Sequence, residues 1–166
     1  MDSSGLREFL STLGVVRPRQ GLFEGWLLWL LGVGCLAGLW IGWLSGDGMV
    51  AAPYAGPWFW LSVMVYYPIL EELLFRGALQ GSLWRWGCWS RHEWLRISGA
   101  NLIASLAFVC VHLLHQAPAW ALAVLAPSLA FGYFRDRSRS ILYPIMMHAI
   151  WNGSFFLGRV LSVNAS

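Results

Sequence analysis

The chain has 166 residues, of which 58% are hydrophobic and only 11% are charged. With a mean hydropathy of +0.57, this composition is too apolar for a soluble domain and indicates a membrane protein. The net charge of +3 comes from arginines scattered along the chain, which argues against a nucleic-acid-binding surface.

The N-terminal part of the chain combines a polar segment with an apolar one. Residues 1–20 are mostly polar, and the run 22–44 is long enough to cross a bilayer as a helix. This run is longer than a signal-peptide core and has no small-residue cleavage site after it. We therefore expect residues 1–56 to form an N-terminal segment and a first membrane span that is retained.

Four further apolar stretches follow, at 57–84, 97–116, 118–134 and 141–158. They predict an all-α fold, a polytopic transmembrane helical bundle of about five spans, within a single membrane domain over residues 1–166. The last two stretches are close to the lower length limit for spanning and could instead be partly re-entrant.

The arginines predict the orientation of these spans. They precede the first span, follow the second and follow the fourth, whereas the loops 45–56 and 116–118 contain none. Because cytoplasmic loops carry the excess of Lys and Arg, we expect the N-terminus in the cytoplasm and the C-terminus outside.

Three charged residues lie within the second apolar stretch: Glu71, Glu72 and Arg76. Each charge at the bilayer centre costs about 3 kcal/mol, so a helix with only a structural role would avoid them. Glu72 and Arg76 are four residues apart, which favours a structural ion pair on one helix face. Glu71 lies about 100° away around the axis and is the candidate general base. The alternative is that all three form a buried ion network that holds helices together.

The third and fifth stretches add His112, His148 and Asn152. His148 and Asn152 share a helix face because they are four residues apart. A lone histidine in a membrane is often only a hydrogen-bonded core residue, but its occurrence with two glutamates favours a catalytic site. We expect His115, near the end of its helix, to lie at the interface.

Two prolines precede these groups, Pro68 before Glu71 and Pro144 before His148. Each is expected to free the carbonyl four residues upstream and to kink its helix, which would make room for water. Prolines are also common in transmembrane helices without such a role.

The three cysteines, Cys35, Cys88 and Cys110, are odd in number and show no CxxC spacing. This argues against a disulfide framework or a thiolate metal site, and we expect all three to be packing residues. Cys110 and His112 lie about 200° apart on a helix, so they do not form a nucleophile and its base.

Three short motifs occur in order on separate predicted spans: Glu71-Glu72-x-x-x-Arg76, Phe108-x-x-x-His112 and His148-x-x-x-Asn152. They resemble the EExxxR, FxxxH and HxxxN motifs of the CPBP family, the CAAX-prenyl-protease and bacteriocin-processing intramembrane proteases also called Abi proteins. The resemblance covers residues 57–158, which we interpret as a minimal catalytic core.

The resemblance implies hydrolysis of a peptide bond by an activated water. Glu71 and His112 would deprotonate and position this water, and His148 and Asn152 would stabilise the tetrahedral oxyanion. Glu72 and Arg76 would support the site.

The expected substrate is a membrane-associated protein or peptide, cleaved near the bilayer in a C-terminal sorting tail or at a prenylated C-terminus. The compact, Trp-rich chain is more similar to small bacterial proteases of the myxosortase type, which suggests the bacterial inner membrane. We expect no metal or other cofactor, with zinc as the alternative because two histidines and two carboxylates could bind it. No HExxH motif is present.

Two other functions remain open at this stage. The first is a non-enzymatic membrane immunity or scaffolding protein that keeps the motif residues as a buried network. The second is a proton-coupled transporter, although the sequence shows no repeated halves. The sequence does not indicate the oligomeric state.

Overall fold

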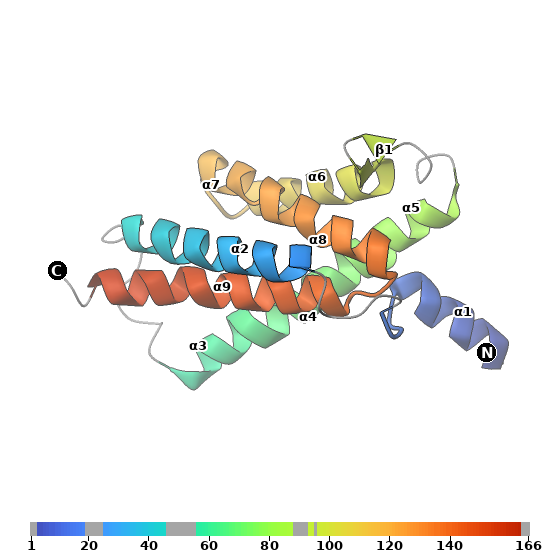
Figure 1. Cartoon of the computed structure of the whole chain (residues 1–166), viewed down its shortest axis with the longest axis horizontal. Helices are drawn as coiled ribbons and strands as arrows, with labels where there is room; N and C mark the ends of the chain where they lie inside the picture. The colour runs from blue at the N-terminus through green and yellow to red at the C-terminus, as the bar shows by residue number, and fades with distance from the viewer. Residues whose placement is uncertain (1–2, 19–24, 46–55, 88–92, 95, 164–166) are drawn as a thin grey trace. The chain divides into compact units, whose positions relative to one another are not determined.

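The computed structural model describes residues 3–18, 25–45, 56–87, 93–94 and 96–163. The described residues are helical apart from the connections and one short hairpin, which confirms the all-α class (Figure 1). The chain divides into two compact units. The first contains residues 1–20 and 70–145, and the second contains residues 21–69 and 146–166.

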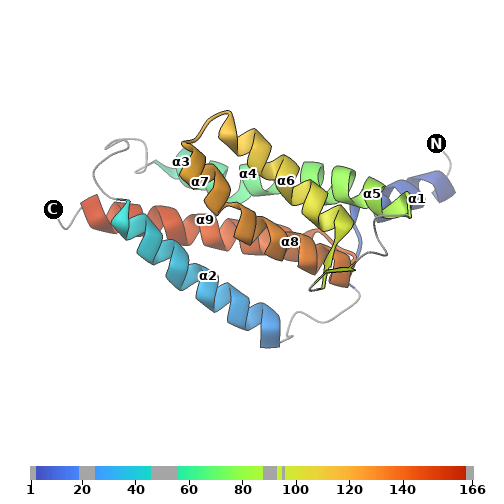
Figure 2. The same cartoon turned by 90° about the horizontal axis from the view of Figure 1, so that it is seen from above.

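The first unit is built from helices of unequal length. Their bounds are α1 (Ser3–Leu13), η4 (Leu73–Gln80), α5 (Gly81–Arg85), α6 (Gly99–Leu113), α7 (Pro118–Ala123) and α8 (Leu125–Ser138). Helix α6 packs against α8 and η4, and α1 packs against η4 and α5 (Figure 2). The core of this unit therefore lies between η4, α6 and α8.

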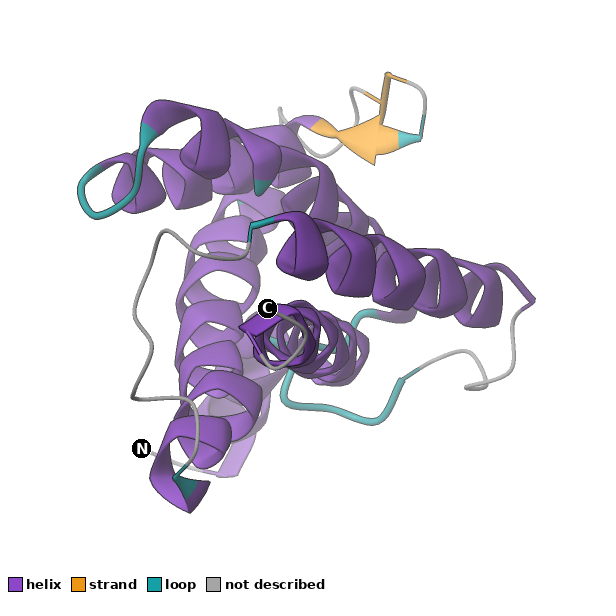
Figure 3. Ribbon diagram, turned by 90° about the vertical axis from the view of Figure 1, so that its left-hand side faces the viewer, coloured by secondary structure: helices purple, strands orange, loops and turns teal. Residues whose placement is uncertain are grey.

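A short antiparallel hairpin leads into α6 and is orange in Figure 3. It consists of β1 (Glu93–Trp94) and β2 (Ile97–Ser98), with Glu93 opposite Ser98. The hydroxyl of Ser98 then accepts a hydrogen bond from the backbone N–H of Asn101 and caps α6. This N-cap satisfies one of the free donors at the helix start.

The second unit contains α2 (Gly25–Leu44), α3 (Pro57–Leu61), η3 (Ser62–Tyr66) and most of α9 (Leu142–Val163). Helix α4 (Tyr67–Glu72) connects η3 to η4, so that residues 57–85 are helical without a break. Glycines bring α2 and α9 into contact. A Cβ atom at Gly42 would clash with the backbone of Phe155, and one at Gly158 with the backbone of Leu39. Close approach through small residues is typical of helix packing in membranes.

Two of the described helices, Gly25–Leu44 and Pro57–Arg85, are long and apolar enough to cross a membrane. The third expected span is α6, which has 15 residues and is about 22 Å long, shorter than a hydrocarbon core of about 30 Å. The predicted single helix over 118–134 is wrong, because the helix breaks at Val124 and α8 then continues to Ser138. The number of spans is thus not confirmed.

The two prolines have different effects. Pro68 follows η3, a π-helical turn in which the N–H of Tyr67 donates to the carbonyl of Ser62, five residues earlier. Pro144 is the third residue of α9, where a backbone N–H has no helical partner and proline costs little. The predicted kink at Pro144 is therefore wrong, because no helix precedes it to be kinked.

Candidate active site

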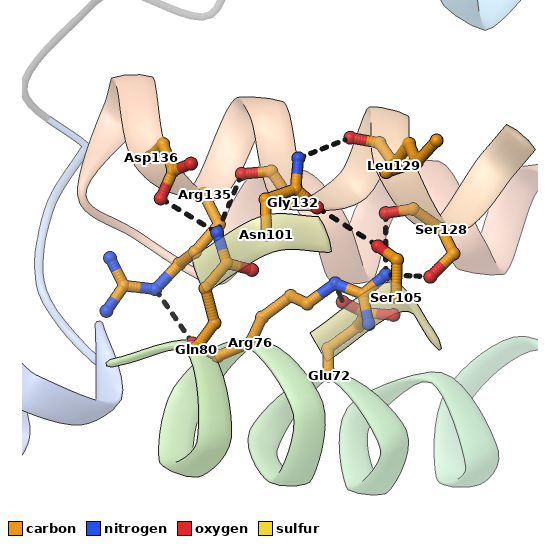
Figure 4. A network of polar contacts seen from close by, with 10 residues as sticks. All are labelled: Glu72, Arg76, Gln80, Asn101, Ser105, Ser128, Leu129, Gly132, Arg135 and Asp136. Carbon is orange, nitrogen blue, oxygen red and sulfur yellow. Dashed lines mark hydrogen bonds and ion pairs between the residues drawn. The ribbon is translucent and has the colours of Figure 1, made fainter. Parts of the chain in front are cut away.

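The side chain of Arg76 is fully buried in the first unit and surrounded by compensating groups (Figure 4). Its Nε lies 3.4 Å from Oε2 of Glu72, and its Nη2 donates to the carbonyl and the hydroxyl of Ser128, each at 2.7 Å. The guanidinium carbon lies 5.3 Å from the ring centre of Phe108 and 5.8 Å from that of Phe131. A carboxylate, two oxygens and two aromatic rings thus replace water around this cation.

The helix that carries this pair is unusually wound. The π-helical segment η4 starts directly after Glu72 and contains Arg76. Wide turns of this kind occur often at functional sites. Helix α1 lies against the end of η4 and the start of α5. A Cβ at Gly81, the first residue of α5, would clash with the carbonyl of Thr12, and one at Gly77 in η4 would lie 3.1 Å from the carbonyl oxygen of Leu13.

A second buried layer lies one turn further along. Gln80 donates through Nε2 to the carbonyl of Gly132 at 3.0 Å and to Oδ1 of Asp136 at 2.8 Å. The hydroxyl of Ser98 donates to the other carboxylate oxygen of Asp136. These bonds join η4, β2 and α8 and fix the rotation of the helix that carries the glutamates.

The contact between α6 and α8 is also polar. Asn101 donates through Nδ2 to the carbonyl of Leu129 at 3.0 Å and accepts a bond from the hydroxyl of Ser105, also at 3.0 Å. Gly132 lies so close that a Cβ there would clash with the carboxamide of Asn101. Both Asn101 and Ser105 are fully buried, so this contact holds α6 in one register on α8.

Arg135 connects three parts of the first unit. Its Nε donates to the carbonyl of Arg76 at 3.2 Å, and its Nη2 donates to the carbonyl of Thr12 at 2.8 Å. The prediction that Arg135 belongs to a loop after the fourth apolar stretch is wrong, because Arg135 is a buried residue of α8. It ties the backbone of the motif helix to the N-terminal helix.

The sequence analysis did not identify Gln80, Asn101 or Ser105 as supporting residues, although their spacing was visible. Glu72, Arg76 and Gln80 follow one another at intervals of four, as do Asn101 and Ser105. Polar residues that recur at this interval in an apolar helix mark one inward face. Ser128 and Asp136 carry no such signal, and only the packing of α8 reveals their part.

Glu71 is half-buried at the end of α4, next to the fully buried Glu72. The two carboxylates therefore differ in environment, as their rotation around the helix predicts. Glu72 is committed to the ion pair with Arg76, and Glu71 is not a member of that pair.

His112 is half-buried near the end of α6, and its imidazole forms a hydrogen bond with a backbone carbonyl. Its Nδ1 lies 2.9 Å from the carbonyl oxygen of Phe108. The ring of Phe108 also stacks on the imidazole, with 4.3 Å between ring centres. Because a carbonyl only accepts, Nδ1 carries the proton in this arrangement, and in neutral His112 the lone pair is on Nε2.

Cys110 is exposed, so the prediction that it packs inside is wrong. It continues the outward stripe of α6 formed by Leu102 and Leu106. Cys35 is half-buried, and Cys88 lies outside the described residues. His115 is exposed beyond the end of α6.

The remaining motif residues belong to the second unit. Asn152 of α9 donates through Nδ2 to the carbonyl of Val63 at 3.1 Å, and His148, one turn earlier, is buried. The six predicted site residues are thus divided. Four of them lie in the first unit, and His148 and Asn152 lie in the second.

Within the part of the chain that the structure describes, no three His, Cys, Asp or Glu side chains gather as a metal site would require. Glu71 and His112 in the first unit do not by themselves supply the three or four ligands that zinc takes from a protein.

Comparison with protein families decides the classification. A family model described as type II CAAX prenyl endopeptidase Rce1-like matches residues 53–154, which is more than half of the chain. The chain belongs to this family. The matched range includes all three motifs, and the CPBP resemblance is therefore confirmed. No curated protein and no solved structure matches the chain. As a member of the Rce1-like family, the chain is classified with the hydrolases, as a membrane-embedded endopeptidase.

Proposed function

We propose that this Rce1-like protein is an intramembrane endopeptidase that cuts a peptide bond near the bilayer surface. Its substrate is a membrane-associated protein or peptide that carries a C-terminal sorting tail or a prenylated C-terminus. The protein resides in the bacterial inner membrane with its N-terminus in the cytoplasm. The observation that carries this proposal is the hydrogen bond between His112 and Phe108, because it directs a basic nitrogen away from the helix backbone.

Glu71 and His112 activate the water in this proposal. Nε2 of His112 accepts a hydrogen bond from the water and orients it, and the carboxylate of Glu71 takes its proton as the oxygen attacks the scissile carbonyl. Glu71 then returns the proton to the amine as the C–N bond breaks. General base catalysis of this kind contributes about 10²- to 10⁴-fold to the rate.

His148 and Asn152 supply the donors for the oxyanion. Both lie on one face of α9 at a spacing of four residues, so two N–H groups can point to one oxygen. The loss of one such donor costs about 3 kcal/mol in transition-state stabilisation. The proposal assigns these two donors to the same reaction as Glu71 and His112.

The pair Glu72–Arg76 has a supporting role. Because both charges are compensated within the first unit, Glu72 is not the group that takes the proton. The bonds of Arg76 to Ser128 fix the turn on which Glu71 lies.

The reaction needs no metal in this proposal, and zinc is the alternative. Activity that persists in metal-free buffer with a chelator supports the metal-free route. Restoration of an inactive apoenzyme by stoichiometric zinc would contradict the metal-free route and support the zinc alternative.

The decisive experiment is co-expression of the protein with candidate substrates, followed by mass analysis of their C-termini. We expect the intact protein to shorten a prenylated or tail-anchored substrate, and Glu71→Gln to leave it intact while folding normally. Glu8→Gln is the matched control, because Glu8 lies in α1 in an exposed ion pair with Arg85 and should leave cleavage unchanged. If Glu71→Gln preserves the biological effect, the protein acts as a non-enzymatic immunity or scaffolding factor.

A further inference from the structure

The carbonyl of Val63 receives no hydrogen bond from the N–H of residue 67 or of residue 68, the two donors that an α-helix or a π-helix would provide. In η3 the N–H of Tyr67 donates to Ser62, five residues earlier, and not to Val63, four residues earlier. The next bond in this register would join the N–H of residue 68 to Val63. Residue 68 is proline, which has no N–H. The carbonyl of Val63 thus depends on a donor from outside its helix, because buried carbonyls are rarely left unpaired.

Asn152 supplies this donor. Its Nδ2 lies 3.1 Å from the carbonyl oxygen of Val63, and Val63 is buried. A carbonyl can only accept, so the nitrogen and not the oxygen of the carboxamide must face Val63. The contact therefore sets which way round the Asn152 amide lies.

We infer that Pro68 is a positioning residue for Asn152: by withholding a backbone N–H, it leaves the Val63 carbonyl to hold the carboxamide in one orientation. Nδ2 carries two hydrogens, and Val63 takes one of them. The second has no acceptor among the residues that the structure describes, and in the proposed function, on which this inference rests, it faces the oxyanion. The proline thus orients a donor on another helix without contact to the substrate.

The test separates orientation from activity. Val63 precedes Met64, and no other valine in the chain precedes a methionine. Labelling with [1-¹³C]valine and [¹⁵N]methionine therefore makes the Val63 carbonyl the only directly bonded ¹³C–¹⁵N pair. Solid-state NMR can then follow its chemical shift in the full-length protein in bilayers.

We expect Asn152→Ala to move the Val63 carbonyl signal upfield, because its hydrogen bond is lost. In a Pro68→Ala background, residue 68 has an N–H that can bond Val63, and Asn152→Ala should then leave the signal in place. Equal shifts in both backgrounds, or no shift in either, would overturn the inference. These outcomes do not depend on proteolysis, so they stand apart from a failure of the proposed function.

Cleavage rates provide the second readout. Pro68→Ala should lower kcat by about 10-fold or more with little change in KM, because a misplaced donor weakens only the transition state. Pro144→Ala is the matched control: it also follows a tyrosine but lies in the first turn of α9, so kcat should change less than about twofold. Equal kcat for both variants in an active enzyme would contradict the role of Pro68.

Discussion

Nδ1 of His112 lies 2.9 Å from the carbonyl oxygen of Phe108, one helical turn earlier. The ring of Phe108 stacks on the same imidazole and also lies near the guanidinium of Arg76. One residue thus links the histidine of the second motif to the arginine of the first. This gives a physical reason for a large aromatic residue four positions before the histidine.

His112→Ala should lower kcat by about 100-fold, because the attacking water is no longer held in position, without unfolding the protein. The measurement is cleavage of a defined substrate at saturating concentration. Cys110→Ser is the matched control on the same helix, because Cys110 is exposed and plays no part in the proposed reaction. A large loss of activity in Cys110→Ser would contradict the proposal and indicate that Cys110 is a nucleophile.

Glu72→Gln should destabilise the protein by about 3–5 kcal/mol, because it leaves the Arg76 cation buried without its counter-ion. The change is measured as the free energy of unfolding in detergent. Arg85→Gln breaks the ion pair with Glu8, whose side chains are 55% and 64% exposed, and such surface pairs contribute about 1 kcal/mol or less. If the two variants lower the free energy of unfolding equally, the Glu72–Arg76 pair does not stabilise the protein as its geometry indicates.

Gly42→Ala should destabilise the packing of α2 on α9 by about 1–3 kcal/mol, as overpacking does, because the new methyl group would meet the backbone of Phe155. Gly32→Ala, on the same helix, is the control: no atom lies within 4 Å of its added Cβ, and it should be neutral or slightly stabilising. Thermal unfolding of both variants in the same detergent decides between these outcomes.

The sequence was most informative where a pattern is local. The four-residue spacing predicted the contact between Glu72 and Arg76 that the structure contains. The same reasoning could have identified Gly34, Gly38 and Gly42 as a packing stripe of α2, because small residues at this interval allow helices to approach closely. Such features depend only on the helix to which they belong.

The sequence was less informative where neighbouring segments decide the conformation. Apolar composition predicted one helix over 118–134, although proline fits best in the first turn of a helix and Pro127 would lie in the middle of this one. The structure begins α8 at Leu125, which places Pro127 there. The π-helical turns η3 and η4 were also not predictable from an apolar pattern, because they depend on how these segments pack and on where proline withholds an N–H.

The contacts of α1 bear on which fragment of the protein should be stable when it is expressed alone. The family match begins at residue 53, so residues 3–13 could be left out when a shorter form of the protein is expressed. Yet Arg135 bonds the carbonyl of Thr12 with the same guanidinium that holds the backbone of Arg76. Deleting α1 would remove the carbonyl of Thr12 as the acceptor for Arg135, so a fragment of this protein should retain α1.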